Sequence, residues 1–283
     1  MLAPALSALS LSPAEFREVA RLAFEVAGLQ LRDGKENLVR SRLARRLRAL
    51  GLPTFGAYLA HVREDASRRE LAEMVDLLTT NKTDFFREPA HFAYLRDTVL
   101  AQHPVGSPLR VWSAGCSTGE EPYTLAMVVR EALPDLDRRD VRILATDISR
   151  RVLTQARAGV YAPAAMAGVP EALRRRHFAR VVSPREASGR DAGAPAWQVV
   201  EPVRRLVAFA ALNLMGPWPM SGPFDAIFCR NVMIYFDKPT QQGLVDRFRE
   251  LLAPGGHLFV GHAESLSGLS HRFRFVQPAV YRR

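Results

Sequence analysis

Residues 109–123 read LRVWSAGCSTGEEPY, and this stretch decides the fold. A short run with β-branched and aromatic residues, 109–114, leads into a segment that contains Gly115 and Gly119, and a helical pattern follows over 120–132. Small residues let the backbone turn tightly between a strand and a helix, and the first turn of that helix presents unpaired N–H groups. The stretch therefore predicts a strand–turn–helix unit that approaches a nucleotide-like ligand.

The chemistry of this turn narrows the choice of ligand. The glycine spacing is Gly-x-x-x-Gly rather than the dinucleotide fingerprint, and no Gly-Lys-Ser/Thr follows it. Glu120 and Glu121 at the helix start repel phosphate and attract a cationic group, such as the α-amine of S-adenosylmethionine. The alternative is an ordinary tight turn in front of a charged helix start.

Three more strand patterns follow, VRILATD at 141–147, FDAIFCRN at 224–231 and HLFVGHA at 257–263, each separated from the next by helical patterns. Such alternation predicts an α/β fold with a parallel, doubly wound sheet. Ligands of that architecture bind at the carboxyl ends of the strands. Asp147 ends the second strand, where a carboxylate can accept hydrogen bonds from ribose hydroxyls. Alternatively, Asp147 caps the helix that begins near Ser149.

The first 80 residues have a different pattern, because helical spacing of apolar residues recurs without strand signals. Capping boxes at Ser12–Glu15 and Ser67–Glu70 each predict a helix start, and a second helix is expected from about Gly34 to Leu50. We therefore predict a small all-helical domain over residues 1–80.

The remaining chain is predicted to divide into a linker over 81–98, which contributes to the cofactor site, and a main α/β domain over 99–283. The segment 183–196 reads SPREASGRDAGAPA and is polar and turn-rich, with strand-like residues on both sides. It predicts a small antiparallel β insertion, over 181–210, within the main domain.

The composition is that of a globular protein, with 283 residues, 48% of them hydrophobic, and a formal net charge of +10. Residues 1–11 lack a basic leader and are interrupted by polar residues and a proline, so we expect neither a signal peptide nor a membrane span. Cys116 and Cys229 lie in apolar, strand-like contexts, as reduced and buried thiols do, which fits a cytoplasmic location. The positive charge implies an anionic partner, which is nucleic acid, a membrane surface or an acidic protein.

Half of the excess charge lies in one predicted helix. Residues 35–48 carry six basic side chains and one acidic side chain, a local charge of +5. Val39, Leu43, Leu47 and Leu50 are expected to form a buried apolar stripe, and Arg42 and Arg45 are expected to point away from it. An arginine row suits a partner helix that bears glutamates, whereas the plain alternative is a solvated helix face.

Several ordered motifs resemble one protein family. They are NKTDFFRE at 81–88, SAGCSTGEEPY at 113–123, ATDIS at 145–149, Asn213-Leu214, FDAIFCRNVMIYF at 224–236, APGG at 253–256 and GHAES at 261–265. In this order they resemble the CheR family of chemotaxis-receptor glutamate methyltransferases over nearly the whole chain, and the RNVMIYF segment is the most specific of them. The resemblance implies a Rossmann-like S-adenosylmethionine-dependent methyltransferase domain behind a small helical domain.

The resemblance also implies the site residues. The cofactor, released as S-adenosylhomocysteine, is expected to contact Asn81, Thr83, Arg87, Gly115, Glu121, Asp147, Asn213, Leu214, Arg230 and Asn231. Arg87 and Tyr235 are the expected catalytic residues, Arg42, Arg45 and Arg46 are expected to bind the substrate, and no metal is expected. Plain alternatives remain for some of them: Asn213 turns the chain, Arg230 pairs with Asp225 or Asp237, and Tyr235 packs in the core.

The implied function is methylation of glutamate carboxylates to methyl esters on the cytoplasmic helical region of transmembrane chemoreceptors, by a monomeric cytoplasmic enzyme. Neither nucleic acid binding nor membrane insertion is expected. Two rival functions are a nucleic acid methyltransferase and a non-catalytic module that binds S-adenosylmethionine or a receptor tail. Enzymes that methylate planar nitrogens usually carry an Asn/Asp-Pro-Pro-Tyr/Phe element, and this chain has Arg230-Asn231-Val232-Met233 in its place.

Overall fold

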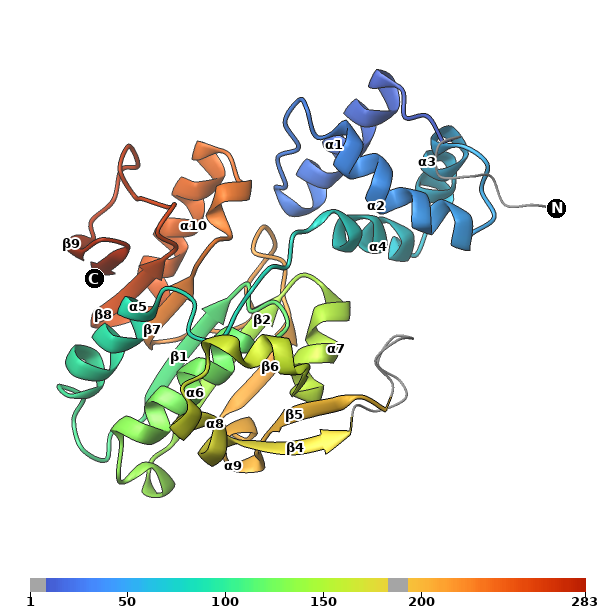
Figure 1. The fold of residues 1–283 in the computed structure, drawn as a ribbon. Coiled ribbons are helices and arrows are strands. Elements are labelled where there is room, and N and C mark those ends of the chain that lie inside the picture. Colours follow the sequence, from blue (N-terminus) through green and yellow to red (C-terminus); the bar gives the residue numbers. More distant parts are fainter. Residues whose placement is uncertain (1–8, 183–192) are drawn as a thin grey trace. The chain divides into compact units, whose positions relative to one another are not determined.

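The structure is a computed structural model in which residues 9–182 and 193–283 are described (Figure 1). The chain forms two compact units. The helical unit comprises Met1–Thr80, Asn213–Met215 and Tyr235–Thr240, and the sheet unit comprises Asn81–Leu212, Gly216–Ile234 and Gln241–Arg283.

The helical unit is built from α1 (Pro13–Ala27), α2 (Glu36–Ala49), α3 (Phe55–Glu64) and α4 (Arg69–Leu78). The predicted capping box at the start of α1 is confirmed, because Glu15 N donates to Ser12 Oγ at 3.3 Å and Ser12 N donates to Glu15 Oε2 at 2.8 Å. The apolar stripe of α2 is also confirmed for Val39, Leu43 and Leu47, which are fully buried, whereas Leu50, at the C-cap of the helix, is only half-buried.

The second predicted capping box, Ser67 to Glu70, is wrong. Helix α4 begins at Arg69, and its N-cap residue Arg68 has a left-handed backbone and makes no side-chain cap. The backbone N–H of Glu70 instead donates to Asp65 Oδ2 at 2.7 Å. The Glu70 side chain does not turn back to the helix start, because it is buried and bound to Arg46 and to the hydroxyl of Tyr58.

The sheet unit contains a seven-stranded sheet in the order β6-β2-β1-β7-β8-β10-β9. The strands are β1 (Leu109–Ala114), β2 (Val141–Asp147), β6 (Val207–Ala211), β7 (Phe224–Cys229), β8 (Leu252–Val260), β9 (Arg274–Gln277) and β10 (Val280–Arg282). The first five in spatial order pair in parallel, and β10 pairs antiparallel with both β8 and β9. The predicted α/β class with a mainly parallel sheet is confirmed.

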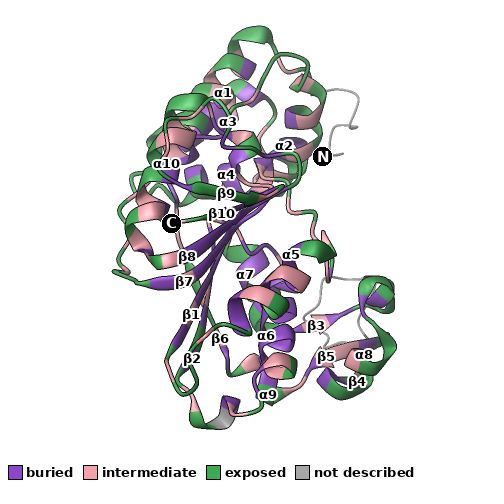
Figure 2. Ribbon diagram, turned by 90° about the vertical axis from the view of Figure 1, so that its left-hand side faces the viewer, coloured by how far each residue is buried: buried purple, intermediate pink, exposed green. Residues whose placement is uncertain are grey.

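Helices cover both faces of this sheet. Figure 2 shows α6 (Glu120–Ala132) and α7 (Arg150–Ala158) on one side of the sheet and α10 (Lys238–Leu251) on the other. The chain runs outward from β1 to β2 and β6, then returns to place β7 on the other side of β1. The order therefore reverses between β1 and β7, and ligands of doubly wound sheets bind at such a point, outside the carboxyl ends of the strands.

A small antiparallel sheet is also present, in the order β3-β5-β4, with β3 (Val160–Tyr161), β4 (Phe178–Val182) and β5 (Pro195–Val199). It was expected over 181–210, but it starts at Val160, and β6 at 207–211 pairs with β2 in the main sheet. Residues 183–192 of the expected insertion lie outside the described residues. The shorter elements are α5 (Pro89–Tyr94), η2 (Leu95–Leu100), η3 (Leu136–Arg138), η4 (Pro163–Gly168), α8 (Glu171–His177), α9 (Glu201–Arg204) and η5 (Met233–Tyr235).

Large aromatic side chains fill the centre of the sheet unit. Trp112 on β1 is fully buried, and its indole N–H donates to Thr146 Oγ1 on β2 at 2.9 Å. Phe228 on β7 stacks on Phe259 on β8 with ring centroids 4.1 Å apart. Both cysteines are free and buried, as predicted. Among residues 9–182 and 193–283, none of the helices has the length and apolar character needed to cross a bilayer.

Candidate active site

The loops that follow β1 and β7 meet at the point where the strand order reverses. Gly115, directly after β1, has a φ of 91°, and a Cβ atom there would lie 2.3 Å from Val232 Cγ2. Real atoms do not approach so closely, and a positive φ of this size also favours glycine. The predicted tight turn at Gly115 thus brings the loops after β1 and β7 into close contact, and the approach of Gly115 to a ligand stays a prediction.

Asp147 fixes the loop after β1. Its Oδ2 accepts the N–H of Ser117 at 2.8 Å, and its Oδ1 accepts the N–H of Ser149 at 2.9 Å. The alternative that Asp147 caps the following helix is wrong, because the N-cap of α7 is Ser149, whose hydroxyl accepts the N–H of Val152. Asp147 therefore lies where the carboxyl ends of β1 and β2 meet, and its expected contact with a ribose stays a prediction.

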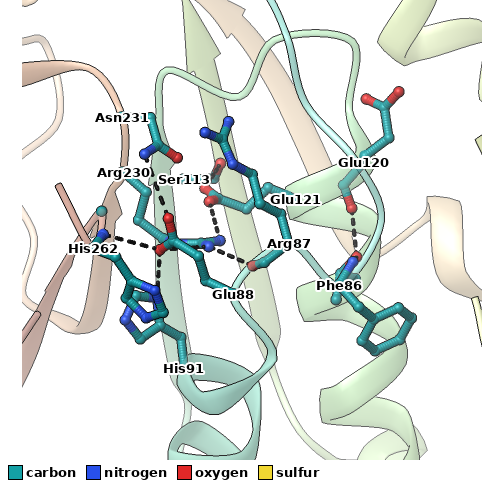
Figure 3. A network of polar contacts seen from close by, with 12 residues as sticks. Phe86, Arg87, Glu88, His91, Ser113, Glu120, Glu121, Arg230, Asn231 and His262 are labelled. Carbon is teal, nitrogen blue, oxygen red and sulfur yellow. Dashed lines mark hydrogen bonds and ion pairs between the residues drawn. The ribbon is translucent and has the colours of Figure 1, made fainter. Parts of the chain in front are cut away.

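Arg230, directly after β7, is the centre of a buried ion network (Figure 3). Its Nη1 lies 2.9 Å from Glu121 Oε2, and its Nη2 lies 3.0 Å from Glu88 Oε2 and also donates to the carbonyl of Arg87. Ser113 donates to the other oxygen of Glu121 at 2.7 Å. One guanidinium therefore faces two carboxylates, and their net negative charge suits a cationic ligand group.

The sequence alternatives for Arg230, a pair with Asp225 or with Asp237, are wrong. Asp225 Oδ2 instead accepts the backbone N–H of Arg110 at 2.8 Å. Asp237 Oδ1 accepts the N–H of Thr240 at 3.0 Å, at the start of α10. Both aspartates serve the backbone of nearby elements, so Arg230 draws its partners from α6 and from the segment before α5.

The two glutamates at the start of α6 have different surroundings. Glu121 points to the Arg230 network, whereas Figure 3 shows the Glu120 carboxylate turned away from it. Burial raises the pKa of Glu120 to about 7, although Thr118 donates to its Oε2 at 2.7 Å. Burial also raises the pKa of Glu121, and Arg230 opposes this effect. Of the two adjacent glutamates, Glu121 is therefore part of the Arg230 ion network and Glu120 is not.

The segment 81–88 runs along the site. Ser117 Oγ donates to the carbonyl of Asn81 at 2.9 Å, and Phe86 N donates to Thr124 Oγ1 on α6 at 3.2 Å. The half-buried Arg87 donates to the carbonyl of Lys82 at 3.0 Å. Thr83 is also half-buried on this segment. Asn81, Thr83 and Arg87 are thus brought to the loops after β1 and β7 by the backbone of one segment.

Left-handed backbone conformations concentrate at this site. Six residues other than glycine have a positive φ among the described residues, and four of them are Phe86, Glu88, Ser117 and Asn231. Such conformations cost free energy and persist where surrounding contacts impose them. Their concentration in three loops at one end of the sheet is typical of a functional site.

Two acidic residues of the site had no assigned role in the sequence analysis. Glu88 binds Arg230, and its Oε1 lies 3.5 Å from Asn231 Nδ2. Glu264, in the loop after β8, accepts the backbone N–H of Asn231, which follows β7, and the backbone N–H of Gly261, which follows β8. Both lie inside the quoted motifs NKTDFFRE and GHAES, but a sequence gives no sign of which distant groups they contact.

Glu88, His91 and His262 each offer a ligand atom within 4.8 Å of the others. His91 is fully buried, and burial lowers its pKa to about 4. A metal ion is a poor occupant, because the Glu88 oxygen nearest His91 is also the oxygen that accepts from Arg230. We therefore assign Glu88 to the ion network.

Besides the arginines of α2, three predicted site residues belong to the helical unit. Asn213 Nδ2 donates to the carbonyl of Val26 at 2.6 Å, and Asn213 Oδ1 accepts the N–H of Met215 at 3.0 Å, so Asn213 does turn the chain. Leu214 is buried. The carbonyl of Tyr235 accepts the N–H of Gln30 at 2.9 Å, and the Tyr235 side chain is half-buried.

The arginines of α2 are not a uniform exposed row. Arg42 donates to the carbonyls of Leu78 and Thr79, at the end of α4. Arg46 makes a two-pronged ion pair with the buried Glu70, at 2.9 and 2.6 Å. Arg45 is exposed. The expectation that Arg42 points away from the packed surface is therefore wrong, because its guanidinium caps α4.

Comparison with known proteins matches both parts of the chain. Residues 14–79 match the family "CheR methyltransferase, all-alpha domain", and residues 81–282 match "CheR methyltransferase, SAM binding domain". A probable chemotaxis protein methyltransferase of Rhizobium etli is 43% identical over 92% of this chain and 96% of its own length. Chemotaxis protein methyltransferase 2 of Pseudomonas aeruginosa is 43% identical over 94% and 92%, and the chemotaxis protein methyltransferase of Escherichia coli is 42% identical over 96% and 92%.

Proposed function

The chain belongs to the CheR methyltransferase family and is an S-adenosylmethionine-dependent methyltransferase, and we propose that it esterifies glutamate side chains on chemotaxis receptors. One observation carries the proposal: the Arg230–Glu121–Glu88 network lies at the reversal point of the sheet, beside the glycine turn. Its surplus of negative charge complements a cationic cofactor, and the missing side chain of Gly115 lets the loop after β1 pack against Val232 in the loop after β7.

The proposed cofactor contacts follow the predicted residues. In the sheet unit these are Asn81, Thr83, Arg87, Gly115, Glu121, Asp147, Arg230 and Asn231, and in the helical unit they are Asn213 and Leu214. Glu121 serves the amine through the negative charge that it shares with Glu88 around Arg230. Asp147 serves the ribose from the end of β2. The bound cofactor supplies an electrophilic methyl group on a sulfonium centre.

The protein's chemical task is alignment. A glutamate carboxylate is already ionised at neutral pH, so no general base is needed before its oxygen attacks the methyl carbon. As the oxygen–carbon bond forms, the carbon–sulfur bond breaks, and the products are the methyl ester and S-adenosylhomocysteine. Arg87 orients the attacking carboxylate, and Tyr235 packs beside the transferred methyl.

The proposed partner is the cytoplasmic helical region of a transmembrane receptor. The enzyme is proposed to act on it as a monomer in the cytoplasm. Its glutamates would be recognised by the basic face of α2, of which Arg45 is an exposed member. The domain division that accompanies this proposal is a helical domain over 1–80, a linker over 81–98 that contributes to the cofactor site, and a methyltransferase domain over 99–283.

Labelled methyl transfer tests the proposal. Purified protein, receptor-containing membranes and S-adenosylmethionine with a tritiated methyl group should give labelled receptor. Mild base should then release the label as methanol, because a glutamyl ester hydrolyses and a methylated nitrogen does not. Base-stable label on nucleic acid would support the rival enzyme class. Cofactor binding without transfer to any receptor membrane would support the non-catalytic module.

A further inference from the structure

The Glu264 carboxylate accepts hydrogen bonds from backbone N–H groups of two loops. Its Oε2 accepts from Asn231 at 2.7 Å and from Gly261 at 2.5 Å, and its Oε1 accepts from Ile234 at 3.1 Å. Asn231 and Ile234 follow β7, whereas Gly261 directly follows β8. One carboxylate thus ties the segment after β7 to the loop after β8.

The carboxylate is buried, with only 7% of the residue exposed. Burying a carboxylate is costly unless hydrogen bonds compensate it, and N–H donors to an ionised oxygen make strong hydrogen bonds. Burial accordingly raises the pKa of Glu264, and the backbone hydrogen bonds from Gly261, Asn231, Ile234 and Met233 oppose this effect. The hydrogen bonds therefore fix the position of the Glu264 carboxylate, and the carboxylate fixes the positions of the backbone N–H groups that donate to it.

The contact is tight around Gly261. A Cβ atom on Gly261 would lie 2.5 Å from Asn231 Nδ2, 2.8 Å from Glu264 Oε2 and 2.9 Å from Asn231 N. Only glycine leaves room for these three groups to meet. The side-chain amide of Asn231 is held on its other side, at 3.5 Å from Glu88 Oε1.

The segment that Glu264 holds is part of the proposed cofactor site. It begins with Asn231, whose φ of 59° is left-handed, and continues through Val232, which faces Gly115. Asparagine adopts a left-handed backbone more readily than most residues other than glycine, and contacts on either side of it select this conformation over the others open to it. Hydrogen bonds to the N–H groups of Asn231 and Ile234 supply that constraint at both ends of the turn.

We propose that Glu264 is a positioning residue for cofactor binding, which acts by holding Asn231 in its left-handed conformation. This inference rests on the proposed cofactor contact of Asn231. The Glu264 side chain itself contacts backbone N–H groups of the protein, so its effect on the cofactor is transmitted through the Asn231–Ile234 segment.

Calorimetric titration with S-adenosylhomocysteine tests the inference, after the wild type has been shown to bind. In Glu264→Gln an amide NH2 replaces one acceptor oxygen and opposes the N–H donors. We expect its Kd to rise about tenfold, the equivalent of about 1.4 kcal/mol and of one hydrogen bond. The KM for S-adenosylmethionine should rise in parallel, while the KM for the receptor stays within twofold of wild type.

Two further variants separate positioning from stability. Gly261→Ala leaves the carboxylate intact but displaces Asn231, and it should raise the cofactor Kd as Glu264→Gln does. Leu136→Ala creates a cavity at a buried position on η3, and it should lower the Tm without changing the Kd of the folded protein. Glu250→Gln, on the exposed surface of α10, controls for the change of charge.

The outcomes are distinct. A wild type that fails to bind S-adenosylhomocysteine refutes the proposed function itself. A binding wild type, together with Glu264→Gln or Gly261→Ala at a Kd within twofold of it, refutes the positioning role. If Glu264→Gln does not fold, Gly261→Ala and Glu264→Asp, which is too short to reach all of its backbone donors, decide the matter by the same criterion.

Discussion

Arg230 and Glu121 form a buried ion pair across the point where the strand order reverses, with Nη1 2.9 Å from Oε2 and side chains only 2% and 11% exposed. The pair joins the loop after β7 to the first turn of α6. Glu88 completes it from the segment before α5, so three parts of the chain that are distant in sequence share one guanidinium. The network thus links the stability of this end of the sheet to the cofactor site.

Arg230→Ala should lower the free energy of unfolding by about 3–5 kcal/mol, because two carboxylates would be left in a buried site without their cation. Arg230→Lys should recover only part of this loss, since an ammonium cannot reproduce the fork that reaches both carboxylates and the Arg87 carbonyl. Urea unfolding measures both effects. An Arg230→Ala protein as stable as wild type would show that the network contributes no stability.

Arg87→Ala should weaken cofactor binding and nearly abolish methyl transfer. Stability should change by about 0.5 kcal/mol or less, because the half-buried side chain donates to one backbone carbonyl, that of Lys82. Single-turnover rates and titration calorimetry separate the two effects. Lys82→Ala, an exposed change in the same segment, is the matched control and should retain turnover. Near-normal turnover of Arg87→Ala would remove Arg87 from the mechanism.

The fold of the sheet unit was predictable, because each of β1, β2, β7 and β8 carries its own apolar run and is followed or preceded by a helical pattern. The strand β6 was not placed correctly. Its sequence VAFAA is short and half-exposed, and only its pairing with β2 distinguishes it from the neighbouring insertion. Periodicity reports burial along one element, whereas strand order depends on contacts with other elements.

The placement of residues at the candidate site was predictable where a residue follows a strand end, and less so where its contacts involve a residue that is distant in the sequence. Gly115, Asp147 and Asn231 belong to the first group. Glu264 belongs to the second, since its donor Asn231 lies 33 residues earlier in the chain. The contacts of Arg42 and Arg46 were also not predictable, because their partners, Leu78 and Glu70, lie on another helix. These contacts hold both guanidinium groups against α4 instead of leaving them free in solvent.

Glu120→Gln should make the protein more stable relative to wild type as the pH rises from about 4.5 to 7. The folded-state pKa of Glu120, about 7, exceeds the ordinary value of 4.5, so between these pH values the folded state binds more protons than the unfolded state. Unfolding free energy from this group therefore falls as pH rises, and levels off above pH 7. The difference between the two proteins should approach about 3 kcal/mol at neutral pH.

Urea unfolding at several pH values measures this difference, and subtraction of the two curves removes the contribution of the other titrating groups. Glu250→Gln, at an exposed position, should show no such trend. A constant difference between Glu120→Gln and wild type from pH 4.5 to 7 would mean that Glu120 titrates normally.

Arg45→Glu should reduce receptor methylation at least tenfold while leaving the cofactor Kd and the Tm unchanged. Arg45 is exposed on α2, whereas Arg42 caps α4 and Arg46 neutralises the buried Glu70, so reversal of either would also perturb folding. The expected loss reflects repulsion between the new carboxylate and receptor glutamates, and added salt should diminish the difference between Arg45→Glu and wild type.

Arg17→Glu makes the same charge change at an exposed position of α1 and should methylate the receptor normally. Equal loss in both variants would indicate that net charge, rather than the face of α2, attracts the receptor, and unchanged methylation by Arg45→Glu would remove Arg45 from the docking surface.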